Sequence, residues 1–151
     1  MGLCGMAASY LAFCALHFLQ FVLAITVCGL YGVDLHNAAQ NGKYIDAKWV
    51  YAEVVGSLSA VTAVVYSTPC LLRFASVWVW NAVLFCLWAG LVGAFGSMYI
   101  GQDPRDDPDL MRMKNAVWVD LASAVLWLIS TVASFTYWWR HRAHRTSRSN
   151  V

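Results

Sequence analysis

The stretch NAVWVDLASAVLWLISTVASFTYWW, residues 115–139, decides the fold, because it is long and apolar enough to cross a bilayer yet contains one acid. A hydrocarbon core about 30 Å thick needs roughly 20 mainly apolar residues in a helix. Three further stretches meet this requirement, at about 8–31, 48–67 and 77–100. The acid, Asp120, needs a reason of its own, since a charge in hydrocarbon is costly.

Composition agrees with a membrane protein. The chain has 151 residues, of which 60% are hydrophobic and 12% charged, and its mean hydropathy is +0.57. Soluble domains are about half apolar and about a quarter charged. The segments between the apolar stretches are too short to form a soluble domain. We therefore expect a single transmembrane domain over 1–151, with these four spans and a short basic tail at 140–151.

Cysteine placement and the lack of catalytic motifs exclude several classes of protein. The loops expected at 32–47 and 101–114 contain no cysteine, so neither carries the disulfides on which tetraspanins, claudins and connexins depend. The chain contains no H-E-x-x-H, G-x-S-x-G or P-loop motif, and PRDDPD at 104–109 lacks the regular spacing of a calcium loop. We therefore expect no catalytic residue, no metal and no cofactor.

Small and polar residues recur along each span at alternating steps of three and four, the spacing of one helix face, which we call a seam. Helices in lipid associate through close packing and hydrogen bonds, so seams are expected to meet. The last span has Ala116, Asp120, Ser123, Trp127, Ser130 and Ser134, and the third has Ala82, Cys86, Ala89, Gly93 and Gly96. The second has Glu53, Gly56, Ala60, Ala63 and Ser67, and the first has His17, Gln20 and Ala24. The sequence therefore predicts an all-α integral membrane four-helix bundle with up-down-up-down order.

Asp120 and Glu53 are the acids within the expected spans. Each lies five positions after a polar residue at the start of its span, Asn115 or Lys48, so both carboxyls are expected about 7–8 Å below the same interface. An acid at this depth must face protein, accept hydrogen bonds or carry a proton. In one interpretation the acids and Ser123 are contacts between helices that fix their packing. In the other they form a proton or cation site, with His17 or Gln20 deeper in the bundle.

An even number of spans places both termini on one side of the membrane. Lys and Arg are divided five and five between the two sides, so the positive-inside rule does not choose by count. Density favours a cytosolic tail, because four Arg follow the last span within nine residues. Such clusters attract anionic lipid, at about 1 kcal/mol per charge near the surface. We expect lipid contacts, and no binding of nucleic acid, from Arg140, Arg142, Arg145 and Arg148.

Two cysteines lie just outside the spans, on the face expected to be cytosolic. Cys4 and Cys70 are candidates for palmitoylation, the alternative being an unmodified thiol. The N-terminal MGLCGM departs from the myristoylation pattern, because Met6 stands where Ser or Thr is required.

A family resemblance lies in the last three spans. Its residues are AKWVYAEVVGSLSAVTAVVY at 47–66, NAVLFCLWAGLVGAFGSMYI at 81–100 and RMKNAVWVDLASAVLWLISTVASFTYWWRHR at 112–142. With these features the chain resembles the MARVEL-domain family, the membrane-associating domain, and in particular its small fungal members. The resemblance implies an M-shaped tetraspan with both termini cytosolic. It also implies a role in membrane apposition, lipid microdomains or trafficking in place of catalysis.

Two functional hypotheses follow. The first is a non-enzymatic multi-pass protein of the plasma membrane or an endomembrane, which organises lipids, other membrane proteins or further copies of itself. The second is a small transporter or ion-channel subunit in which Asp120 and Glu53 titrate or bind ions. An Asp120→Asn substitution separates them, because an amide can replace an acid in packing but cannot titrate.

Overall fold

The computed structural model describes residues 3–42, 47–67, 77–103 and 107–148, and side chains within these ranges from residue 11 to residue 140. The described residues form four helices and no strand: α1 (Leu3–Gln40), α2 (Ala47–Tyr66), α3 (Val77–Tyr99) and α4 (Pro108–Arg148). The fold is therefore the predicted all-α four-helix bundle.

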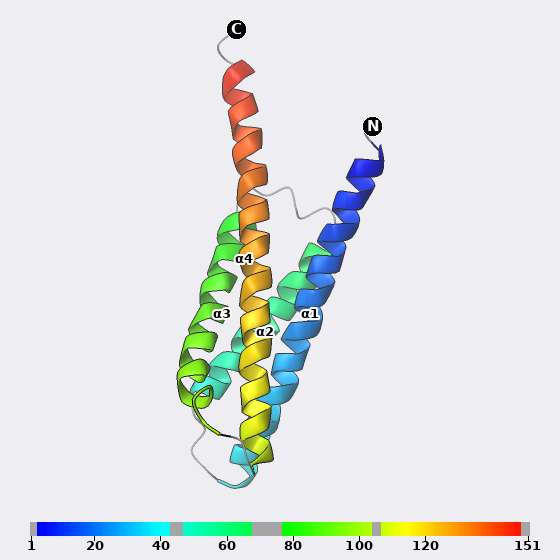
Figure 1. Ribbon diagram of the computed structural model, residues 1–151. Coiled ribbons are helices and arrows are strands. Elements are labelled where there is room, and N and C mark those ends of the chain that lie inside the picture. Colours follow the sequence, from blue (N-terminus) through cyan, green and yellow to red (C-terminus); the bar gives the residue numbers. More distant parts are fainter. Residues whose placement is uncertain (1–2, 43–46, 68–76, 104–106, 149–151) are drawn as a thin grey trace.

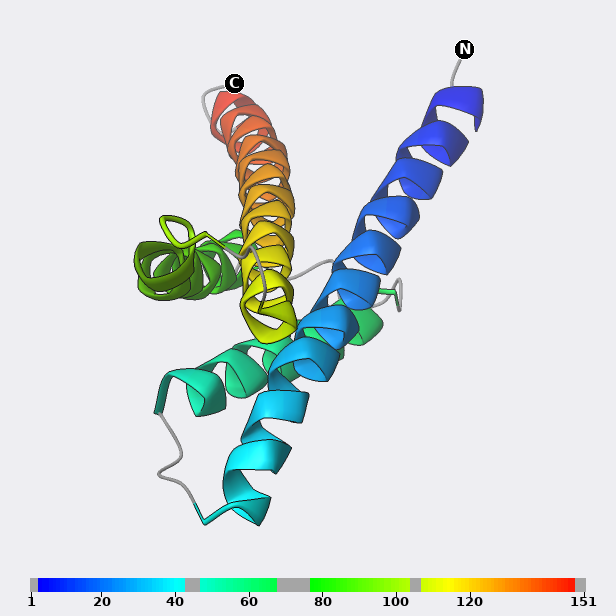
Figure 2. The same cartoon turned by 60° about the horizontal axis from the view of Figure 1, so that its bottom comes forward.

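Successive helices run in opposite directions, so that both termini lie at one end of the bundle, which we call the tail side (Figure 1). The turns after α1 and α3 lie at the other end, the loop side. α1 packs mainly on α2 and α3 mainly on α4, and contact between α1 and α4 joins these two hairpins. Figure 2 shows that α1 and α4 lie close together on the loop side and diverge toward the termini. The contact between α1 and α4 is therefore the centre of the bundle.

All four helices are long and apolar enough to cross a membrane, as expected of a multi-pass membrane protein. The qualifying segments are Leu11–Gln40, Ala47–Tyr66, Val77–Tyr99 and Pro108–Arg140. Large apolar side chains cover the outside of the bundle, including Val54, Val61, Ile129 and Val132. Two exposed tryptophans of α4, Trp118 and Trp139, are separated by about 30 Å along the helix axis. This spacing equals the thickness of a hydrocarbon core, so a bilayer centred on this segment would have both rings at headgroup level.

Both ends of α1 and both ends of α4 differ from the predicted spans 8–31 and 115–139, and on the tail side α1 begins at Leu3 and α4 runs to Arg148. α2 and α3 agree with 48–67 and 77–100 to within a residue, but α1 continues to Gln40 and α4 begins at Pro108. The predicted loops at 32–47 and 101–114 are therefore too long. Hydropathy locates the end of the hydrocarbon, whereas a helix ends where its backbone is capped.

Local capping explains where α1 ends and where α4 begins on the loop side. Gly42 has a φ of 59°, the left-handed conformation that glycine adopts readily at a helix C-terminus. At the start of α4, the Asp107 carboxylate accepts hydrogen bonds from the backbone nitrogens of Asp109 at 2.9 Å and Leu110 at 3.3 Å. Pro108 occupies the first helical position, where its missing N–H costs nothing. Asp107 and Pro108 thus start α4 about two turns before the apolar run that begins at residue 115.

Candidate functional site

Asp120 lies at the contact between α1 and α4 and is fully buried. Its Oδ2 accepts a hydrogen bond of 2.7 Å from the hydroxyl of Tyr31 on α1. The Tyr31 ring is also fully buried and packs against Phe95 of α3, with ring centroids 4.7 Å apart. The Oδ1 atom of Asp120 has no hydrogen-bond partner among the described residues. The acid therefore joins two helices and keeps one oxygen available.

Tyr31 was not among the residues expected inside the bundle. The signal for its position was present, because steps of three and four from His17 lead through Gln20, Ala24 and Val27 to Tyr31. All of these residues are buried. The seam of α1 thus extends further than small and polar residues alone indicated.

Glu53 lies near the level of Asp120 but on another side of α1. It is partly buried, and a Cβ added to Gly32 would lie 3.0 Å from its Oε1. Gly32 thus leaves room for the Glu53 carboxyl, while the neighbouring Tyr31 bonds Asp120. Glu53 Oε1 has no hydrogen-bond partner among the described residues. The structure therefore gives the two acids separate surroundings, because they approach α1 at two adjacent residues that point in different directions.

A second polar group lies nearer the tail side and joins three helices. His17 Nδ1 lies 2.6 Å from Gln20 Oε1, and Gln20 Nε2 donates to Ser130 Oγ of α4 at 2.8 Å. Asn81 of α3 donates to Ser134 Oγ at 3.0 Å. Because the Gln20 amide donates to Ser130, its oxygen faces His17, which must be the donor through Nδ1. In the neutral imidazole His17 Nε2 is then an acceptor, and it has no partner among the described residues.

Ser123 is buried on the same face of α4 but makes no contact of this kind. Its hydroxyl donates to the carbonyl of Val119 in its own helix at 2.9 Å. This local bond satisfies the hydroxyl without a neighbouring helix. Ser123 therefore acts as a small residue that permits close packing.

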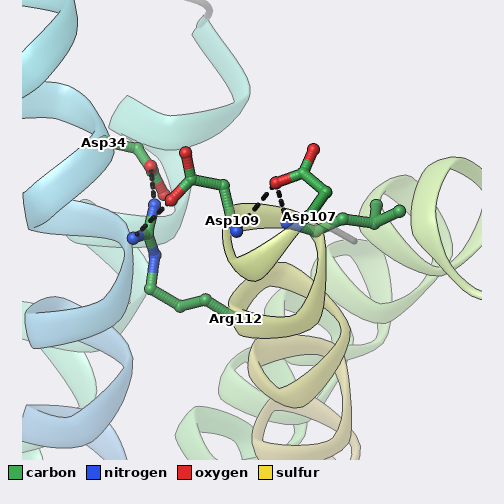
Figure 3. A network of polar contacts seen from close by, with 5 residues as sticks. Asp34, Asp107, Asp109 and Arg112 are labelled. Carbon is green, nitrogen blue, oxygen red and sulfur yellow. Dashed lines mark hydrogen bonds and ion pairs between the residues drawn. The ribbon is translucent and has the colours of Figure 1, made fainter. Parts of the chain in front are cut away.

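The loop-side end of the α1–α4 contact contains an ion pair that the sequence did not indicate. Arg112 of α4 pairs with Asp34 of α1 and, at 3.0 Å, with Asp109 of its own helix (Figure 3). The side chains of Arg112 and Asp34 are 25% and 13% exposed, so this pair is partly shielded from solvent. It was missed because residue 34 was assigned to a loop. Once α1 extends to Gln40, Asp34 is a helical residue facing α4.

We expect the pair of Arg112 and Asp34 to orient α1 against α4. Arg112→Asp and Asp34→Arg should each lower the free energy of unfolding by about 1–2 kcal/mol, because each leaves a partly buried charge beside a like charge. The double exchange should recover at least half of the summed loss. Reversible unfolding in mixed micelles, followed by circular dichroism, measures the cycle. Additive losses in the double variant would show that the two residues are not coupled.

The predicted seam of α3 is wrong. Cys86, Ala89 and Gly93 are exposed, and a Cβ at Gly93 would meet nothing within 4 Å. The buried face has large side chains at the same spacing: Asn81, Leu84, Trp88, Leu91 and Phe95. Trp88 fills the space toward α2 and donates from Nε1 to Ser59 Oγ at 2.9 Å. The predicted spacing was correct, but α3 turns its stripe of larger side chains toward the bundle, because these fill the interior better than small residues do.

The basic tail is part of α4, whose backbone stays helical to Arg148. Arg140 is exposed, while the side chains of Arg142, Arg145 and Arg148 lie outside the described residues, as do Cys70 and the side chain of Cys4. Aromatic rings cluster where α4 leaves the apolar region. Phe135 lies 6.0 Å from both Trp138 and Trp139 between ring centroids, and Trp78 of α3 lies 5.8 Å from Trp138.

No group of three or more His, Cys, Asp or Glu that could hold a metal ion occurs among the described residues. Comparison with known proteins finds no matching family model, no matching curated protein and no matching solved structure. Function must therefore be inferred from the buried polar contacts, the apolar outer surface and the basic end of α4.

Proposed function

We propose that this chain is a non-enzymatic tetraspan protein that organises membrane microdomains, membrane apposition or trafficking, like the MARVEL-domain family that its spans resemble. Both termini are cytosolic in this proposal, and the membrane is the plasma membrane or an endomembrane. Its partners are lipids and other membrane proteins or further copies of the chain. The supporting observation is the use of buried polar groups to join helices.

The interhelical hydrogen bonds carry this proposal. Tyr31 with Asp120 and Gln20 with Ser130 join α1 to α4, Asn81 with Ser134 joins α3 to α4, and Trp88 with Ser59 joins α2 to α3. Interhelical hydrogen bonds and close packing are the forces that hold helices together in lipid. A bundle closed by such contacts offers its outer surface, which is apolar, to lipids and other membrane proteins. This is what an organising protein requires.

A small transporter or ion-channel subunit is the second candidate, and the unpaired acceptors favour it. Asp120 Oδ1, Glu53 Oε1 and His17 Nε2 are buried and have no partner among the described residues. Ionisable residues inside a membrane often mark proton or ion pathways. In this reading Asp120 and Glu53 are the titrating or ion-binding groups.

Asp120→Asn distinguishes the two functions. The amide oxygen can accept the hydrogen bond from Tyr31, so we expect the free energy of unfolding to change by less than about 1 kcal/mol and cellular localisation to persist. Asp120→Leu should cost about 1–2 kcal/mol, because it leaves the Tyr31 hydroxyl buried without a partner. The measurements are unfolding in mixed micelles and ion flux into proteoliposomes, with Glu53→Gln as the matched variant. A flux that wild type supports and Asp120→Asn abolishes, with normal folding, would establish the second candidate instead.

The organising role itself is tested in cells. A tagged chain extracted with its surrounding lipid by an amphipathic polymer should carry a reproducible set of proteins and lipids. Gly93→Leu, which places a large side chain on the exposed face of α3 without entering the bundle, is a useful probe of this outer surface. Wild-type particles with the bulk lipid composition and no associated protein would contradict an organising function.

A further inference from the structure

The place where α4 leaves the membrane is marked by its aromatic rings. Trp78, Phe135, Trp138 and Trp139 form one cluster shared by α3 and α4 on the tail side. Amphipathic rings prefer the headgroup region. Trp118, at the other end of the apolar run, lies about 30 Å away along the helix, so these rings fit the two faces of one bilayer. The tail-side interface is therefore at Trp138 and Trp139.

The helix does not end at this interface. α4 continues to Arg148, and Figure 1 shows its last turns as a straight extension that rises beyond the tail-side end of α3, where that helix begins. The sequence RHRAHRTSR at 140–148 contains neither Gly nor Pro, the residues that most readily break a helix. At 1.5 Å per residue, Arg145 lies about 9 Å and Arg148 about 14 Å past Trp139 along the axis. Even a tilt of about 40° leaves the last backbone position about 10 Å from the interface.

Distance decides which membrane the cations can reach. Attraction to anionic lipid falls off within a Debye length, about 8 Å at physiological ionic strength. The backbone positions of Arg140 and Arg142 lie within this distance of the headgroups in which α4 is anchored. The position of Arg148 lies beyond it at any tilt up to about 40°, and the position of Arg145 lies beyond it at tilts below about 25°. A tail that served only its own leaflet would gain little from a helix that carries half of its arginines away from that leaflet.

We propose that the helical extension of α4 binds the anionic headgroups of a second, apposed bilayer through Arg145 and Arg148, and so bridges two membranes. This inference rests on the proposed function and on the contact with anionic lipid that the sequence predicts for the tail, and it names the membrane that supplies the lipid. The inner pair, Arg140 and Arg142, holds the base of the extension at its own surface. The helix acts as a rigid spacer between the two sets of charges.

The full chain in nanodiscs of neutral phosphatidylcholine tests this, because the tail then has no anionic lipid in its own bilayer. We expect these discs to float with separate liposomes containing about 30% phosphatidylserine. Arg145→Gln combined with Arg148→Gln should weaken this binding about 25-fold, since each cation near an anionic surface changes binding about fivefold. The wild-type interaction should also weaken steeply with added salt.

Ala143→Pro separates helix continuity from charge. It retains all four arginines but breaks the helix next to the interface, so flotation with separate liposomes should fall to the level of the double glutamine variant. Ala143→Ser, which remains helical, should float like wild type. If discs that carry Ala143→Pro float as well as wild type, the role of the helix as a rigid spacer is overturned. If wild-type discs never float, bridging itself is overturned.

A second disc composition distinguishes failure of this inference from failure of the proposed lipid contact. A fluorophore ligated after Val151 in discs of anionic lipid reports binding of the tail to its own bilayer, through quenching by spin-labelled lipid. Quenching in these discs without flotation of neutral discs would keep the lipid contact and reject bridging. If neither quenching nor flotation is observed, the lipid contact itself is rejected, and bridging is rejected with it.

Discussion

Trp127→Ala is expected to lower the free energy of unfolding by about 3 kcal/mol, the lower end of the range for removing a large buried ring. Trp127 has no exposed surface and lies in the α4 seam beside the His17 ring, with centroids 6.4 Å apart. Its removal leaves a cavity between α1 and α4 that neither helix can fill without bending. The lower end applies because the variant in lipid loses mainly packing contacts. The hydrophobic effect, which adds to the cost of such a substitution in water, contributes little here.

Trp118→Ala is the matched control on the same helix. The Trp118 side chain is 60% exposed and lies at headgroup level, so its removal should cost less than about 1 kcal/mol. Unfolding of both variants in mixed micelles, with the helical signal and tryptophan fluorescence followed together, gives the comparison. Equal losses for the two variants would mean that α4 presents a different face to the bundle.

The buried face of α4 was predictable from the sequence, whereas that of α3 was not. In α4 the polar residues Asp120, Ser123 and Ser130 share one stripe, and a polar group in lipid has strong reason to face protein. In α3 two stripes have the same spacing, one of small residues and one with Trp88 and Phe95. Spacing alone ranks them equally. The choice depends on how much volume the neighbouring helices leave to be filled, which a single helix does not reveal.

The polar contacts divide in the same way. Burial of Asp120 follows from its cost in hydrocarbon, but its partner Tyr31 belongs to a helix distant in sequence, and the pairing depends on how α1 and α4 are rotated. The ion pair of Asp34 with Arg112 was missed for a simpler reason. Hydropathy ended the first span at residue 31, although nothing in the following residues prevents a helix. The capping signals at Asp107 and Pro108 were present in the sequence and predict the start of α4 better than hydropathy does.

Gly56→Leu is expected to be the most damaging change at a helix contact, with a loss of about 2–3 kcal/mol. A Cβ at Gly56 of α2 would lie 2.7 Å from Cys28 Sγ and 3.4 Å from the Ala24 carbonyl oxygen, both on α1. The sulfur could move, but the backbone oxygen is fixed in the helix, so α1 and α2 must separate. The gain from replacing a glycine within a helix, about 1 kcal/mol or less, does not offset this. Gly93→Leu, on the exposed face of α3, should be neutral or slightly stabilising.

The contact at Gly56 can be tested more finely through its partner. Gly56→Ala alone should be destabilising, because its methyl group collides first with the Cys28 sulfur. Cys28→Ala removes that sulfur, so the double variant should recover most of the stability lost in Gly56→Ala. Such recovery places the strain between these two side chains and not in the helix backbone. If Cys28→Ala gives no recovery, the limit is the Ala24 carbonyl, and α1 and α2 are then held at a spacing set by their backbones alone.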